Sequence, residues 1–345
     1  MLKGIITYLQ RHPTIPLIKW LSSYTYFFRL LIPELFFLAY KDQTPKQIIK
    51  STEACACSVC DNNYVPGLII LIESILEYNS WFNLPFYIFM DSDKNIDPKN
   101  QQLLLTIYPH FYFLDLEESF REIKSNNKHN IRFNRFSQTY LGLSAFNLIE
   151  YKTVLSLDTD ILCQGNFKIL ISDKVKGDFI AISDSQRPYK TIEYFREQNQ
   201  KKSFISIEST KKLYQVNTGV YVIHKKLIST KVYEELFQLA KDGITNGEQL
   251  GGDQEIVNYY LEKKEGIILT YAPFIYNTSV RSFAGDDFDR INNRKPVFIH
   301  YVGNKPWSSN ILLIGKLKKI RLHWINYAKN KLNEIHNNNL SNYKL

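Results

Sequence analysis

The chain has 345 residues, of which 44% are apolar and 22% charged, and its formal net charge is +9. This length and composition can bury a large core, which excludes disordered, collagen-like and small disulfide-stabilised proteins. The basic charge lies at the ends, because residues 1–50 have a net charge of +5 and residues 311–345 one of +6, whereas residues 51–310 have −2. The nearly neutral centre disfavours a nucleic-acid-binding protein, and we predict no nucleic-acid partner.

Residues 1–50 are rich in Leu, Ile, Phe, Tyr and Trp, but charged residues and prolines interrupt every apolar run. No run approaches the roughly 20 residues that a membrane-spanning helix needs, and no signal-peptide cleavage site follows. We therefore predict a helical N-terminal extension. Two interpretations stay open: helices packed on the main domain, or a segment lying on a bilayer surface, which aromatic residues mixed with Lys and Arg favour.

Three of the four cysteines, Cys55, Cys57 and Cys60, fall in the first β-rich run, at residues 54–60. No second Cys or His pair at zinc spacing follows them, so we expect core residues of a strand and not a metal site. Nothing in this cysteine usage demands an oxidising compartment. We predict a cytoplasmic protein.

From residue 54 onward, short β-rich runs alternate with helical patterns, which is typical of an α/β fold. We expect a single Rossmann-like mixed sheet flanked by helices. Pro66 suits the first turn of a helix that follows the first strand. The remaining strands are expected at residues 86–90, 111–114, 154–157, 179–183, 219–224, 267–270 and 297–300. No linker divides this region, so residues 51–310 are predicted to form one domain.

Residues 311–345 are predicted to form a basic amphipathic helix and a tail. Apolar residues recur there at helical spacing, with lysines and one arginine between them: Leu313, Leu317, Ile320, Trp324 and Tyr327. Such a helix can dock on the core with its basic face in solvent, or it can lie on an anionic membrane surface. Peripheral attachment to the inner face of a membrane is therefore one of two open interpretations.

Acidic and polar residues gather at the ends of predicted strands, where open α/β sheets bind ligands. Asp158-Thr159-Asp160 follows a buried apolar strand, and two carboxylates so placed can hold a divalent cation with room for phosphate oxygens. Asp91-Ser92-Asp93 follows a strand too, but it continues into an ordinary polar loop. No glycine-rich phosphate loop is present in the sequence, which disfavours dinucleotide oxidoreductases and P-loop nucleotidases.

Three further motifs follow in order: Asn-Thr-Gly-Val at 217–220, Gly-Asp-Gln at 252–254, and His-Tyr-Val-Gly-Asn-Lys-Pro-Trp at 300–307. Together with Leu-Asp-Thr-Asp at 157–160, they make residues 54–307 resemble glycosyltransferase family 8. The resemblance implies a GT-A fold and a hexosyltransferase of the EC 2.4.1 type. It implies retaining transfer of glucose or galactose from a UDP-sugar to a glycan or lipid-linked saccharide, as in polysaccharide or lipopolysaccharide biosynthesis. The implied cofactor is Mn²⁺, with Mg²⁺ as the alternative.

The resemblance also implies roles for individual residues. Those implied to bind the metal are Asp158, Asp160 and His300. Lys305 would add a positive charge to the diphosphate, and Gly303 would let the backbone approach it. The other residues implied to bind the donor are Cys57, Asp61, Asn63, Tyr64, Thr159 and Asn217. The residues implied to act at the sugars are Asp184, Asp253 and Gln254. A neutral amide is a weak nucleophile, so we expect Gln254 to stabilise positive charge or to orient hydroxyl groups.

One position departs from the family pattern. Relatives have an arginine that reaches the donor two residues after a Thr-Tyr pair, and here Thr139-Tyr140 is followed by Gly142 at that place. Arg132 or Arg135 would have to supply the charge from a neighbouring turn. The departure keeps a second hypothesis open: a catalytically weak or inactive protein of the same fold that binds nucleotide sugars.

Overall fold

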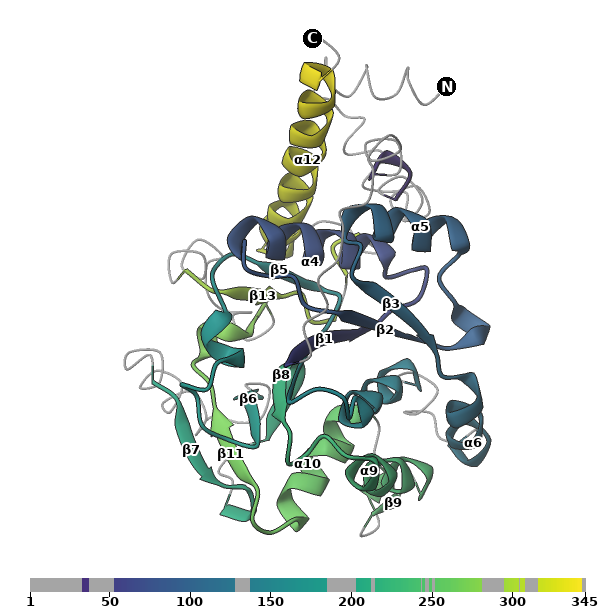
Figure 1. The fold of residues 1–345 in the computed structure, drawn as a ribbon, viewed down its shortest axis with the longest axis vertical. Helices are drawn as coiled ribbons and strands as arrows, with labels where there is room; N and C mark the ends of the chain where they lie inside the picture. Colours follow the sequence, from purple (N-terminus) through teal and green to yellow (C-terminus); the bar gives the residue numbers. More distant parts are fainter. Residues whose placement is uncertain are drawn as a thin grey trace.

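The computed structural model describes residues 33–36, 53–127, 137–184, 203–211, 215–242, 244–245, 248–249, 252–280, 295–303, 305–307 and 316–342 (Figure 1). The expectations for most of residues 1–50, for Arg132 and Arg135, and for Leu313 lie outside these residues.

The main sheet has eight strands in the order β3-β2-β1-β4-β8-β6-β11-β7. These are β3 (Phe111–Asp115), β2 (Phe86–Met90), β1 (Ala54–Val59), β4 (Thr153–Leu157), β8 (Val216–His224), β6 (Phe179–Ser183), β11 (Ile268–Tyr271) and β7 (Ile205–Glu208). Strands β3, β2, β1 and β4 are parallel, whereas β8 is antiparallel to both β4 and β6. This mixed sheet confirms the predicted fold class.

A second, three-stranded sheet contains β12 (Thr278–Ser279), β13 (Phe298–His300) and β5 (Ile161–Cys163). The prediction that residues 297–300 belong to the main sheet, and that there is a single sheet, was therefore wrong. Strand β13 pairs antiparallel with β5, with His300 opposite Ile161. An apolar run of three or four residues predicts a strand but does not say which strand it pairs with, because pairing is decided by tertiary contacts.

Helices cover both faces of the main sheet (Figure 1). On one face α4 (Val65–Tyr78) and α5 (Pro98–Ile107) bury apolar side chains in one core. On the other face the second core is formed by α6 (Glu117–Asn127), the 3₁₀ helix η2 (Ser137–Asn147), α9 (Thr230–Asp242) and α10 (Asp253–Lys263). Pro66 lies in the first turn of α4, as predicted from its fixed φ.

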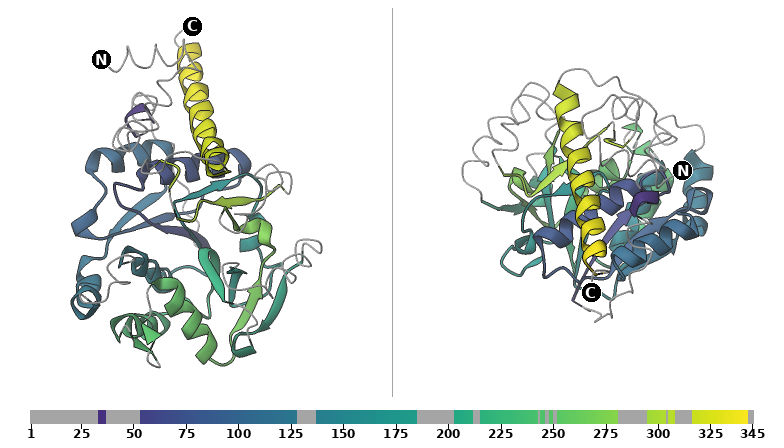
Figure 2. Two further views of the ribbon diagram at one scale, coloured as in Figure 1. Left: turned by 180° about the vertical axis from the view of Figure 1, so that it is seen from behind. Right: turned by 90° about the horizontal axis from the view of Figure 1, so that it is seen from above.

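The C-terminal helix α12 (Lys316–Asn342) projects from the body in both side views (Figures 1 and 2). Its Trp324 is buried against Trp307, with ring centroids 5.3 Å apart. The Tyr327 hydroxyl donates a hydrogen bond to Glu77 of α4 at 2.8 Å. These contacts dock the helix on α4. Within the described ranges, no helix has the length and apolar character required to cross a bilayer.

Candidate active site

The Asp158-Thr159-Asp160 turn runs from the main sheet into the small sheet. The Asp158 amide donates to the carbonyl of Gly219 at 2.8 Å, which continues the β4–β8 pairing. The Asp160 carbonyl accepts from the Tyr301 amide at 2.9 Å, next to the β5–β13 pairing. Strand pairing on both sides of the turn therefore brings His300 to two aspartates that are some 140 residues earlier in the sequence.

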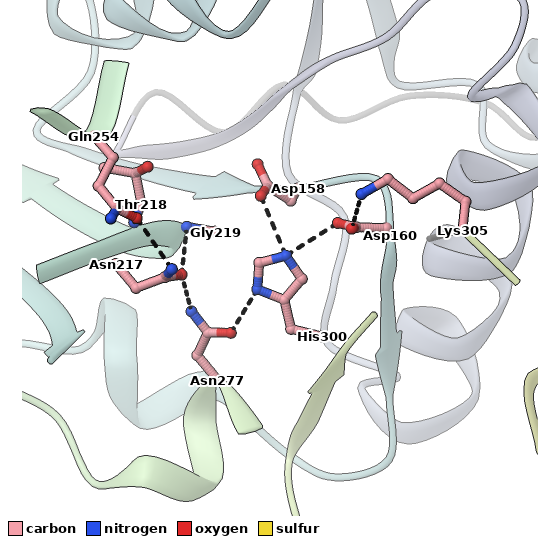
Figure 3. A network of polar contacts seen from close by, with 9 residues as sticks. All are labelled: Asp158, Asp160, Asn217, Thr218, Gly219, Gln254, Asn277, His300 and Lys305. Atoms are coloured by element: carbon pink, nitrogen blue, oxygen red, sulfur yellow. Dashed lines mark hydrogen bonds and ion pairs between the residues drawn. The ribbon is translucent and has the colours of Figure 1, made fainter. Parts of the chain in front are cut away.

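Asp158, Asp160 and His300 each offer one ligand atom, and these atoms lie within 4.8 Å of one another. The His300 Nε2 atom is 3.1 Å from Asp160 Oδ1 and 3.3 Å from Asp158 Oδ2 (Figure 3). Asp160 and His300 are buried, whereas 54% of the Asp158 side chain is exposed, at the wall of a cavity. Two carboxylates and one imidazole fit Mn²⁺ or a similar divalent cation. The role of these three residues as metal ligands stays a prediction.

Charge pairing sets the protonation of this cluster. Burial alone would raise the pKa of the Asp160 carboxyl, but Lys305 and His300 hold it well below its usual range. Burial alone would lower the pKa of His300, but Asp160 and Asp158 raise it to about 9. In the metal-free protein at neutral pH, His300 is therefore a cation between two carboxylates, and a bound metal ion would take the place of its Nε2 proton.

This pairing predicts how the stability of the metal-free protein depends on pH. Against burial, which lowers it, the carboxylates raise the pKa of His300 from 6.5 to about 9. The resulting stabilisation is complete below pH 6.5 and is lost as the pH rises to 9, because the folded protein holds the proton more tightly than the unfolded chain. We expect the free energy of unfolding in urea with a chelator to fall by roughly 3 kcal/mol over this range. In the His300→Gln variant, most of this pH-dependent decrease in the free energy of unfolding should be absent. If the variant shows the same decrease as the wild type, His300 is not the group responsible.

A cavity of about 830 Å³ opens beside the three residues, and this volume suits a nucleotide-sugar-sized ligand. Of the residues predicted to form the site, those that line it are Asp61, Tyr64, Asp158, Thr159, Asp160, Asp184, Asn217, Asp253, Gln254, His300, Gly303 and Lys305. Gly303 has a φ of 94°, a left-handed conformation that favours glycine. Gly142 also lines the cavity.

Lys305 lies between Asp160 and the Tyr64 ring at the wall of the cavity. Its Nζ atom forms an ion pair with Asp160 and is 5.6 Å from the centre of the Tyr64 ring. Trp307 packs edge-on against Tyr64, and its indole N–H donates to the carbonyl of Asn63 at 2.9 Å. The Lys-Pro-Trp motif is thus fixed to the turn that follows β1.

Two residues predicted to bind the donor are not among those that line the cavity. Cys57 is buried in the core beneath it, and burial raises the pKa of its thiol to about 12. Asn63 lies in the turn after β1, where its backbone N–H donates to Asp61 Oδ1 at 2.8 Å. The Tyr64 N–H donates to the same oxygen at 3.2 Å. Cys57 and Asn63 can therefore shape the donor side through the strand and turn they belong to.

A series of side-chain hydrogen bonds runs from Asp184 through Gln254, Asn217 and Asn277 to His300, and Figure 3 shows its part from Gln254 to His300. Gln254 Nε2 donates to Asp184 at 2.9 Å, and Asn217 Nδ2 donates to Gln254 Oε1 at 3.0 Å. Asn277 Nδ2 donates to Asn217 Oδ1 at 2.7 Å, and Asn277 Oδ1 is 2.9 Å from His300 Nδ1. The two ends of the cavity are therefore coupled through three amide side chains.

Asp253 lies at the start of α10 and lines the same cavity. Burial, with a further contribution from Asp158, raises the pKa of its carboxyl to about 7, although Thr139 and Thr218 oppose the rise. A Cβ atom at Gly142 would be 3.8 Å from Asp253 Oδ2, an ordinary contact. Gly142, the position that departs from the expected family pattern, thus lies beside an acidic group.

The sequence did not single out Asn277 or the packing of Gly219. Asn277 is buried at the end of the 3₁₀ helix η5 (Phe274–Tyr276), 23 residues before His300. Its neighbours in the sequence are Tyr276 and Thr278, and no motif marks it. A Cβ atom at Gly219 would lie 2.2 Å from His300 Cε1, so the imidazole occupies the space that any side chain would need.

Both the sequence and the fold are similar to those of known glycosyltransferases. Residues 55–311 match the model of Glycosyl transferase family 8. The chain is 25% identical over 282 residues to a lipopolysaccharide 1,2-glucosyltransferase of Escherichia coli, covering 78% of this chain and 73% of that protein. It is 27% identical over 256 residues to the lipopolysaccharide glucosyltransferase WaaO of Escherichia coli K12, covering 72% and 70%.

Two solved structures show the same fold. The galactosyltransferase LgtC in complex with donor and acceptor sugar analogues superposes with a TM-score of 0.53 at 18% identity, covering 82% of this chain and 96% of that one. The glycosyltransferase GlyE of Streptococcus pneumoniae TIGR4 superposes with a TM-score of 0.52 at 18% identity, covering 85% and 64%. The family model spans most of the chain, and so this protein is a glycosyltransferase of family 8 with a GT-A fold.

Proposed function

We propose that this protein transfers a hexose, glucose or galactose, from a UDP-sugar to a saccharide acceptor with retention of the anomeric configuration. The observation that supports this most directly is the convergence of Asp158, Asp160 and His300 at the wall of a cavity that Lys305 also lines. That arrangement suits a diphosphate, which needs positive charge from a metal ion and a basic side chain.

Asp158, Asp160 and His300 would hold the Mn²⁺ ion, with Mg²⁺ as the alternative. When bound, the metal supplies Lewis-acid stabilisation of the charge that develops on the departing diphosphate. Lys305 would bind the same diphosphate from the side of Tyr64. Gly303 would let its backbone approach closely, and Asp61 and Tyr64 would line the nucleoside side.

On the sugar side, Asp253, Asp184 and Gln254 would hold and orient the donor and the acceptor hydroxyl. The Gln254 Oε1 atom faces the Thr218 N–H at 3.3 Å and the Asn217 amide, so it is held as an acceptor. Its Nε2 group is directed at Asp184. Gln254 would therefore act by electrostatic stabilisation and orientation, and not as a nucleophile.

The test is a donor screen that measures nucleotide release. Purified full-length protein with UDP-glucose or UDP-galactose and Mn²⁺ is expected to release UDP, since donor hydrolysis needs no known acceptor. Removal of the metal with a chelator should reduce the rate by about 10³-fold, as expected if a Lewis acid contributes several kcal/mol, and added Mn²⁺ should restore it. A rate that does not respond to the chelator would contradict the proposed metal site.

A second candidate, an inactive protein that binds nucleotide sugars, is favoured by Gly142 at the place of the family arginine. Calorimetry distinguishes the two. Tight UDP binding without turnover, over a broad panel of donors and acceptors, would favour the binding protein. UDP release in the donor screen would exclude it.

The names of the relatives support a proposal for the acceptor and the place of action. The Escherichia coli proteins are named as lipopolysaccharide glucosyltransferases, and we propose a lipid-linked or lipopolysaccharide-type saccharide as the acceptor. We propose that the enzyme acts at the inner face of a membrane. The basic ends of the chain, including α12, would hold a cytoplasmic enzyme near that surface by electrostatic attraction.

A further inference from the structure

Asn277 is a buried amide that contacts the proposed metal site only through His300. Its side chain is held at both ends, by Asn217 on one side and by His300 Nδ1 on the other. Residue 277 is only 3% exposed, and it leads directly into β12, which pairs with β13 and places Ser279 opposite His300. Main-chain pairing therefore fixes the distance between Asn277 and the imidazole.

One backbone donor determines which group donates and which accepts in the hydrogen bonds that link Asn217, Asn277 and His300. The Gly219 N–H donates to the Asn217 side chain at 2.9 Å, so the atom it meets must be the oxygen Oδ1. The Asn277 atom that lies 2.7 Å from that oxygen must then be the donor Nδ2. It follows that Asn277 presents its oxygen to His300.

An oxygen at this place requires a proton on His300 Nδ1, which lies 2.9 Å from it. When a metal ion takes the place of the Nε2 proton, the imidazole keeps its hydrogen on Nδ1, and the lone pair of Nε2, the atom that faces Asp158 and Asp160, would bind the metal ion. The Cε1–Nδ1 side of the ring fills the space that a Cβ atom at Gly219 would need, so the glycine is what lets the imidazole take this position.

We propose that Asn277 is a positioning residue, which fixes the tautomer and the ring orientation of His300 so that Nε2 is directed at the metal ion. The inference rests on the proposed metal site. Hydrogen-bond partners of metal-bound histidines commonly change metal affinity by 10–100-fold when removed. We expect loss of the Asn277 side chain to weaken Mn²⁺ binding by about 10–100-fold. Asn277 would affect the reaction through Mn²⁺ binding and not through contact with substrate.

The first measurement is Mn²⁺ binding to full-length protein without any sugar donor, from the signal of free Mn²⁺ in electron paramagnetic resonance. Asn277→Leu removes the acceptor at similar volume and is expected to weaken Mn²⁺ binding by about 10–100-fold. Asn79→Leu is the matched control, because Asn79 is also a buried amide but is bonded only to backbone groups and Cys163, away from the site. It should reduce stability and leave Mn²⁺ affinity unchanged. If Asn277→Leu does not fold, the smaller Asn277→Ala replaces it.

Asn277→Asp separates positioning from packing. A carboxylate still accepts from His300 Nδ1, as carboxylates do beside many metal-bound histidines, but it loses the donor to Asn217 and buries a charge. A positioning role predicts that the Asp variant binds Mn²⁺ more tightly than the Leu variant. A purely structural role predicts the reverse order, which would overturn the inference.

Nitrogen-15 NMR of the histidine rings, with diamagnetic Mg²⁺ bound, provides a second readout. Nδ1 of His300 should show the chemical shift of a protonated ring nitrogen in the wild type, and this state should be lost or averaged in Asn277→Leu. If the wild type binds Mn²⁺ and the Leu variant binds it equally well, this inference fails and the proposed function stands. If the wild type binds no Mn²⁺, the proposed metal site fails, and the inference with it.

Discussion

Replacement of Asp160 by Asn is expected to reduce Mn²⁺-dependent UDP release by at least about 10³-fold, since the Lewis-acid contribution of a bound metal is several kcal/mol. Asp160 is buried, and its carboxylate contacts both His300 and Lys305. An amide of the same shape removes one proposed ligand and leaves two cationic groups beside a neutral side chain. The measurement is UDP release at saturating Mn²⁺, together with the Mn²⁺ affinity of the folded variant.

Two further variants show whether lost activity comes from lost metal or from lost stability. Breaking a buried ion pair is costly, so Asp160→Asn is expected to unfold more easily than the wild type. Asp158→Asn lacks this complication, because 54% of the Asp158 side chain is exposed, and its UDP release should fall to a similar extent. If both variants keep full activity and still require metal, the site is wrongly assigned.

Another Asp-x-Asp sequence, Asp91-Ser92-Asp93, supplies a control within the same protein. The Asp93 side chain is 72% exposed and paired with Lys124 at 2.7 Å, outside the proposed machinery. Asp93→Asn is therefore expected to keep the activity and Mn²⁺ affinity of the wild type. Within the described residues, the candidate site at residues 158–160 differs from Asp91-Ser92-Asp93 in the histidine that β13 brings beside it.

The sequence was informative where function depends on local pattern. Short apolar runs followed by acidic or amide residues located β1, β2 and β4 within a few residues, and parallel pairing brought their carboxyl ends to one edge of the sheet. The order of motifs indicated the family, which the family model confirms over residues 55–311.

Local pattern could not supply the contacts that form between distant segments. The pairing of β13 with β5 depends on where the chain goes after Asp160, and nothing in residues 297–300 indicates that partner. Asn277 comes close to His300 because β12 pairs with β13, and this pairing is not visible in the sequence. Cys57 belongs to a strand next to the cavity, but its side chain is packed in the core. Side chains alternate between the two faces of a strand, and the sequence does not say which face of β1 is covered by helices.

Gly219→Ala is expected to abolish Mn²⁺ binding, although the substitution adds only one methyl group. The added Cβ atom would lie 2.2 Å from His300 Cε1, 2.5 Å from Nδ1 and 3.0 Å from Asn217 Oδ1. Real carbon atoms do not approach so closely, and β8 is held by pairing with both β4 and β6, so the imidazole has to move. Overpacking of this kind costs roughly 1–3 kcal/mol of stability, and any shift of the ring moves Nε2 from the aspartates.

The measurements are Mn²⁺ affinity and UDP release in protein shown to be folded by its thermal transition. Gly165→Ala is the matched control, because its added Cβ atom would be 3.4 Å from Val297 Cγ2, an ordinary contact outside the site. It should retain wild-type Mn²⁺ affinity. A folded Gly219→Ala variant that binds Mn²⁺ as the wild type does would mean that His300 can be displaced without loss of the metal. The two aspartates would then suffice as its protein ligands, and His300 would serve only as the ion-pair partner that holds them together in the metal-free state.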